Sequence, residues 1–345
     1  MKRRFQFLAL LLPFCAPLLL SAKDPAWLKL RSEHFEIYSA ENEKQSRGVL
    51  EHLERVRKAY ELLTNSKMPA GERARVVLFR NEKEYREYAP DSLSSAHYLG
   101  ERDRDYIVLA DLDSRTQTVL NHEYFHLFSH HAQFRLPVWL EEGLADLYST
   151  LKITDKDVTY GYPLAGHLGY LSSTFGKPLP LSAIFAITRE NRHEGDRNTV
   201  GRLYAQGWAL AHMTFQGKEM ADRSGEFFRK VRDGSTDAAT AYQMVYGLDT
   251  RQLDQLLAAY IRKEYFSYGG VRTGGLNFTA PSERVALEDW EAPLLLADIL
   301  AINRKQDAAK PRYDELAVKF PGIPEIDESR GYADWIGGNR ERATL

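Results

Sequence analysis

The sequence His-Glu-Tyr-Phe-His at residues 122–126 constrains this chain more than any other feature. Residues four apart lie on one face of an α-helix, so the side chains of His122 and His126 can reach the same metal ion. Glu123 lies next to the first histidine and is suited to act as a general base at the open position of that ion. The pattern predicts a helix that carries a catalytic metal site.

A second segment, residues 139–146, supplies carboxylates on a following helix. Glu142 and Asp146 are four residues apart and therefore share one face of that helix. A carboxylate from this face would complete a set of three protein ligands. The fourth position would stay open for water, which distinguishes a catalytic zinc site from a closed structural one.

Two other ligand assignments fail on spacing. The metzincin pattern requires glycine and histidine three and six residues after the second histidine, where this chain has Ser129 and Ala132. His130 lies eight residues from His122, which is about 12 Å along a helix axis and too far for both to bind one ion.

The two segments together resemble those of the gluzincin metallopeptidases, and in particular the short peptidase-MA-like domains of secreted bacterial proteins. The match covers His122-Glu123-x-x-His126 and Trp139-Leu140-x-Glu142-Gly143-Leu144-Ala145. The resemblance implies that Glu142, and not Glu141, is the third zinc ligand. It also implies that Asp146 bonds a ligand histidine, which we expect to be His122. The chain departs from the large aminopeptidases in its short connection between His126 and Glu142 and in lacking their Gly-x-Met-Glu-Asn element.

The resemblance implies a secreted zinc peptidase in which a zinc-activated water attacks the peptide bond and Glu123 serves as the general base. Gluzincins also use a tyrosine or histidine from the second half of the domain as a donor to the developing oxyanion. Tyr204, at the start of a predicted helix, is our candidate for that donor, with Tyr160 and His212 as alternatives. The substrate would pair with an edge strand, for which the predicted strand at residues 106–110 is the candidate.

Two other functions remain open. The chain is alternatively a scaffold or binding protein with a catalytically degenerate zinc domain, which recruits a protein partner through its C-terminal repeats. A zinc hydrolase that acts on something other than peptides is the third possibility. The presence of Glu123 favours the peptidase, because a scaffold has no need for a general base.

The first residues predict an export signal. Three basic residues precede an apolar run at residues 7–20, and Ser21-Ala22 offers a small-residue cleavage site. Cleavage after Ala22 would leave 43 basic and 48 acidic residues and would change the formal net charge from −2 to −5. We therefore expect a periplasmic or extracellular bacterial protein with no membrane span after cleavage and no nucleic-acid partner. An uncleaved N-terminal anchor is the alternative.

The order of elements predicts an α+β fold. Strands are expected at residues 34–39, 75–79 and 105–110, and helices dominate after the metal motif. The expected division is a signal peptide at 1–22, a zinc-peptidase-like domain at 23–268 and a Gly-rich linker at 269–280. Residues 281–345 resemble a tetratricopeptide-type helical segment. A stub of this size either packs on the peptidase domain or belongs to a longer repeat protein.

Overall fold

The computed structural model describes residues 27–65, 73–92, 94–101, 104–172, 177–189, 191, 196–263, 265–274 and 280–339. The predicted signal segment, residues 1–22, lies outside these ranges. The described chain combines a mixed β-sheet with many helices, which confirms the α+β class. None of the helices in the described ranges is long and apolar enough to cross a membrane.

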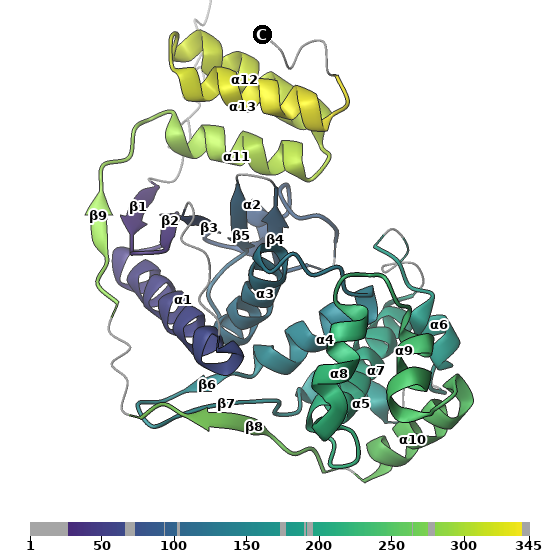
Figure 1. The fold of residues 1–345 in the computed structure, drawn as a ribbon. Coiled ribbons are helices and arrows are strands. Elements are labelled where there is room, and N and C mark those ends of the chain that lie inside the picture. Colours follow the sequence, from purple (N-terminus) through teal and green to yellow (C-terminus); the bar gives the residue numbers. More distant parts are fainter. Residues whose placement is uncertain are drawn as a thin grey trace, which may run out of the picture.

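The larger sheet has six strands in the order β4-β5-β3-β2-β1-β9 (Figure 1). Its strands are β1 (Leu28–Arg31), β2 (Phe35–Ser39), β3 (Ala74–Leu78), β4 (Ala96–Gly100), β5 (Asp105–Leu109) and β9 (Glu283–Val285). β2, β3 and β5 are parallel, whereas β4, β1 and β9 pair antiparallel with their neighbours. The three strands predicted from the sequence are confirmed as β2, β3 and β5.

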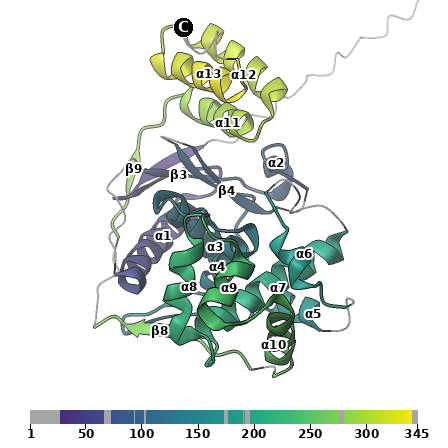
Figure 2. The same ribbon diagram turned by 45° about the vertical axis from the view of Figure 1, so that its right-hand side comes forward.

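Helices cover both faces of this sheet. α1 (Glu43–Thr64) and α3 (Thr116–His131) lie on one side, and α11 (Glu291–Ile302) lies on the other (Figures 1 and 2). Side chains alternate along each strand, so Val76 packs with the α1 and α3 side while its neighbour Val77 packs with the α11 side. The sheet is therefore buried on both faces, which explains the continuous apolar run of β3.

The remaining helices build the expected helical second half. They are α4 (Val138–Ser149), α5 (Ala165–Leu171), α6 (Leu181–Phe185), α7 (Arg197–Gln216), α8 (Ser224–Val231), α9 (Ala238–Tyr246) and α10 (Thr250–Arg262), whereas the short α2 (Glu82–Tyr85) lies earlier, between β3 and β4. α4 and α7 approach closely at two glycines. A Cβ on Gly143 would lie 2.6 Å from the carbonyl oxygen of Gly207, and a Cβ on Gly207 would lie 3.0 Å from that of Trp139. Glycine at these positions thus allows α7 to lie directly against the helix that carries Glu142.

The predicted linker is partly a strand. Gly269–Arg272 form β8, which pairs with β7 (Asp157–Tyr160), and β7 in turn pairs with β6 (Lys152–Ile153). A Cβ on Gly270 would lie 2.5 Å from the carbonyl oxygen of Val158. This glycine therefore permits close strand pairing in a segment that the sequence predicted to be a linker. Residues 275–279 of the predicted linker lie outside the described residues.

The C-terminal helices pack on the sheet, which is the first of the two arrangements expected for them. α11 is followed by α12 (Gln306–Lys319) and α13 (Pro324–Ile336). Apolar residues of α11 share one buried cluster with Val77 and Val108 of the sheet. Residues beyond the boundary predicted after residue 268 thus complete one face of the sheet.

A buried polar network fixes α11 to the sheet. The Asp298 carboxylate accepts hydrogen bonds from Arg104 Nη1 at 2.9 Å and Tyr313 Oη at 2.8 Å. Asp298 and the Arg104 side chain are almost fully buried. Asp298→Ala should therefore lower the free energy of unfolding by about 3–5 kcal/mol, because it leaves the guanidinium without its buried counter-charge. Urea denaturation followed by circular dichroism measures this loss.

Glu328 provides the matched control. Its carboxylate pairs with the same guanidinium at 3.1 Å, but its side chain is 73% exposed. Glu328→Ala should cost less than about 1 kcal/mol, as solvent-exposed ion pairs usually do. A loss for Asp298→Ala as small as that expected for Glu328→Ala would show that the buried Asp298 carboxylate does not hold the C-terminal helices in place.

Candidate metal centre

Two helices bring the predicted ligands together. His122 and His126 project from α3 one turn apart, and Glu142 projects from the first half of α4. One ligand atom from each of the three residues lies within 4.8 Å of the other two. His130, which was rejected on spacing, does not belong to this group.

The separations of these atoms fit a tetrahedral ion. The two histidine Nε2 atoms are 3.2 Å apart, and Glu142 Oε2 lies 3.5 Å from His122 Nε2 and 3.7 Å from His126 Nε2. Ligands at zinc–nitrogen and zinc–oxygen distances near 2.1 Å in a tetrahedron stand about 3.4 Å apart. Two imidazoles and one carboxylate are also a donor set that zinc accepts in catalytic sites. The residues present therefore fit a zinc ion.

Asp146 lies one turn beyond Glu142 and bonds two histidines. Its Oδ1 atom is 2.9 Å from His122 Nδ1, and its Oδ2 atom is 2.7 Å from His167 Nε2. The pairing with His122 is the one expected from the sequence. Burial raises the pKa of Asp146, but the neighbouring His167 and His122 outweigh burial and hold this pKa well below its usual value. Asp146 is thus an ionised acceptor that can fix the orientation of His122.

Glu123 is buried, His122 and His126 are half-buried, and the charges of these side chains shift one another's pKa values. Burial lowers the pKa of His122, but hydrogen bonds to Asp146 and Glu142 outweigh burial and raise this pKa overall. Burial raises the pKa of the Glu123 carboxyl, against the opposing effect of the two imidazoles. A carboxylate with a raised pKa accepts a proton more readily, which suits a general base.

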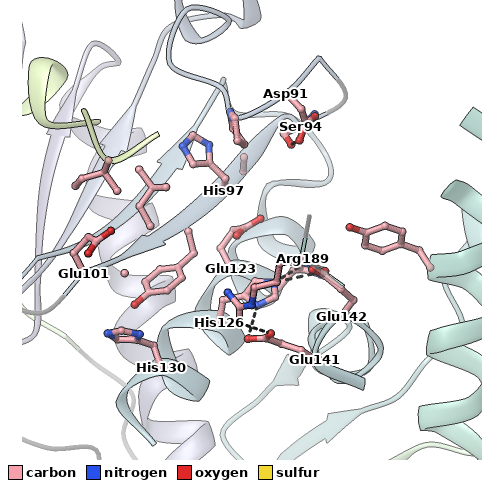
Figure 3. A pocket seen from close by; sticks show the side chains of 18 of the residues that line it. Asp91, Ser94, His97, Glu101, Glu123, His126, His130, Glu141, Glu142 and Arg189 are labelled. Carbon is pink, nitrogen blue, oxygen red and sulfur yellow. Dashed lines mark hydrogen bonds and ion pairs between the residues drawn. The ribbon is translucent and has the colours of Figure 1, made fainter. Parts of the chain in front are cut away.

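A cleft of about 510 Å³ opens over this group. Glu123, His126 and Glu142 line one side of the cleft, and β4 lies across from them (Figure 3). Figure 3 shows Glu123 lying between the strand that carries His97 and the histidine–glutamate group. The proposed base and the proposed ligands therefore face one common space large enough for part of a peptide.

The strand beside the cleft is β4, and not the predicted strand at residues 106–110. That predicted strand is β5, which is hydrogen-bonded to β3 on one side and to β4 on the other. It has no free edge, so the prediction that it pairs with substrate is wrong. β4 is the terminal strand of the sheet, and all five of its residues line the cleft.

Tyr204, on α7, lines the same cleft. It does not open a helix as predicted, because α7 begins at Arg197, after an Asp196 cap that accepts from the Thr199 amide. The alternative donor His212 is fully buried, and its ring nitrogens lie 2.7 Å from Tyr260 Oη and 2.9 Å from the Gly161 carbonyl oxygen. Both ring nitrogens of His212 therefore have hydrogen-bond partners in the core, which leaves neither nitrogen to bond an oxyanion.

Two contacts at the site were not predicted. His167 on α5 bonds Asp146, and Arg189 forms a 2.8 Å ion pair with Glu141. Glu141 Oε1 also lies 3.8 Å from His126 Nδ1, on the side of the ring away from the other ligands. Glu141 thus lies outside the space between the two Nε2 atoms and Glu142, so Glu142 is the better placed of the two glutamates to bind the metal. No pattern in the sequence points to either contact, since both join segments far apart in the chain.

No protein-family model matches the chain, and a search of the curated proteins finds no significant match.

Proposed function

We propose that the protein is an exported zinc-dependent peptidase of the gluzincin type. The observation that carries this proposal is the convergence of His122, His126 and Glu142 at tetrahedral separations beside Glu123, in one cleft. When bound, zinc lowers the pKa of a coordinated water and polarises the scissile carbonyl. His122, His126 and Glu142 would hold the ion.

The chain's own residues would supply the remaining steps. Glu123 would take the proton of the attacking water and later deliver it to the leaving amine. The free edge of β4 would align an extended substrate by main-chain hydrogen bonds, as an added strand does. Tyr204, which also lines the cleft, would donate a hydrogen bond to the oxyanion that develops on the carbonyl oxygen.

Tyr204→Phe tests the last of these roles. Removal of one oxyanion donor should lower kcat by about 100- to 1000-fold, since that donor acts mainly in the transition state. Zinc content and melting temperature should stay close to wild type, because phenylalanine keeps the ring. A lower melting temperature with unchanged kcat would instead assign Tyr204 to packing.

The proposed activity is tested by incubating the protein, from residue 23 onward, with a peptide library and analysing the products by mass spectrometry. We expect cleavage that stops when zinc is removed with a chelator and returns when zinc is added back. Zinc-loaded protein that cleaves nothing would contradict the peptidase and would favour the degenerate scaffold. Cleavage that persists without zinc would contradict the metal mechanism.

A further inference from the structure

The carboxylate of Asp146 is shared between two imidazoles on opposite sides. His122 Nδ1 lies 2.9 Å from Oδ1, and His167 Nε2 lies 2.7 Å from Oδ2. Asp146 is 7% exposed, and the His167 side chain is 15% exposed. Both oxygens of this buried carboxylate are thus held by a ring N–H from a different segment.

The two hydrogen bonds have different consequences. The bond from His122 uses Nδ1, so Nε2 is the ring nitrogen left to bind a metal beside Glu142 and His126. That bond alone would leave the carboxylate free to rotate, because the terminal torsion of aspartate is broad. The second bond, from His167, removes this freedom. His167 therefore determines how firmly Asp146 can hold the His122 ring.

His167 is positioned by the helical second half of the fold. It lies on α5, and its ring centroid is 5.8 Å from that of Trp208 on α7. Among the described residues that line the cleft, His167 does not appear, and it is not part of the ligand group. A direct contact with a substrate in the cleft is thus not its role.

We propose that His167 is a positioning residue that sets the affinity of the metal centre by locking Asp146, and through it His122. This inference rests on the proposed zinc centre. The packing of α5 against α7 then contributes to metal binding, although neither helix carries one of the proposed metal ligands. The loss of a hydrogen-bond partner of a metal ligand typically weakens metal binding by about 10- to 100-fold. His167 bonds Asp146 and not a ligand itself, so we expect its loss to weaken binding by about 10-fold.

The test measures zinc affinity by competition with a chromophoric chelator, without any activity assay. His167→Phe keeps an aromatic ring beside Trp208 and removes the donor, so zinc should bind about 10-fold more weakly. His167→Gln keeps an N–H donor and should recover most of this loss. In protein that already carries Asp146→Ala, His167→Phe should have no further effect, because the residue through which it acts is gone.

His34→Phe is the matched control. His34 Nδ1 lies 2.7 Å from Oε2 of the buried Glu54, an equivalent imidazole–carboxylate pair on the turn between β1 and β2 and on α1. This variant should bind zinc as wild type does, so a loss confined to His167→Phe excludes a general effect of breaking such a pair. Wild-type affinity in His167→Phe would overturn the positioning role alone. Equal losses with and without Asp146 would also overturn it, and wild-type protein that binds no zinc would overturn the proposed zinc centre as well.

Discussion

Glu123→Gln should lower the rate of peptide cleavage by about 1000- to 10,000-fold while the protein keeps its zinc and its fold. Glutamine has nearly the same shape but accepts no proton, so the substitution removes the base and retains the ligands. Glu123 is buried in the wall of the cleft, between β4 and the ligand group, and this position makes the expectation specific. Cleavage of a peptide library, zinc content and melting temperature are the three measurements.

Glu101→Gln provides a control for the change of charge. Glu101 lines the same cleft and accepts a hydrogen bond from Tyr332 Oη at 3.1 Å, so the variant removes the same charge without touching the ligand group. Its activity should fall far less than that of Glu123→Gln. If Glu123→Gln cleaves peptides as fast as wild type, the proposed mechanism is wrong.

Glu142→Ala should lose most of its zinc, whereas Glu141→Ala should keep it. Removing a ligand should weaken binding by more than the roughly 10- to 100-fold typical of an outer hydrogen-bond partner. The neighbouring glutamates differ in direction, since Glu142 Oε2 lies beside both Nε2 atoms and Glu141 bonds Arg189 instead. Elemental analysis of dialysed protein distinguishes the two. The reverse result would assign the third ligand to Glu141.

Local patterns were sufficient to predict the helices that carry the proposed ligands. The spacing of His122 and His126, and that of Glu142 and Asp146, fixes each pair on one helix face whatever the rest of the chain does. The bond between Asp146 and His122 joins these two faces, and it agrees with the role expected from the resemblance.

The elements that depend on tertiary contacts could not be predicted in this way. β4 has the sequence Ala-His-Tyr-Leu-Gly, which lacks the β-branched residues and the alternation that mark a strand. Its pairing with β5 is what moves the free edge of the sheet away from residues 106–110. His167 likewise reaches Asp146 only because α5 packs against α7, a contact that no periodicity in the sequence encodes.

Glycine was also ambiguous in the sequence. The Gly-rich segment after residue 268 was predicted to be a linker, although Gly270 permits close pairing between β7 and β8. Beyond that segment, β9 joins the main sheet beside β1. The chain beyond it then buries the sheet face opposite α3, so the region first assigned to a separate repeat segment supports the strands of the cleft.

Anomalous diffraction at the zinc absorption edge, from crystals of the protein grown with zinc, would locate the ion and identify its ligands. We expect one strong peak about 2.1 Å from His122 Nε2, His126 Nε2 and a Glu142 oxygen. We also expect Asp146 to stay bonded to His122 and His167 beside the ion. A peak held by other residues, or no peak in crystals that contain zinc, would contradict the proposed zinc centre.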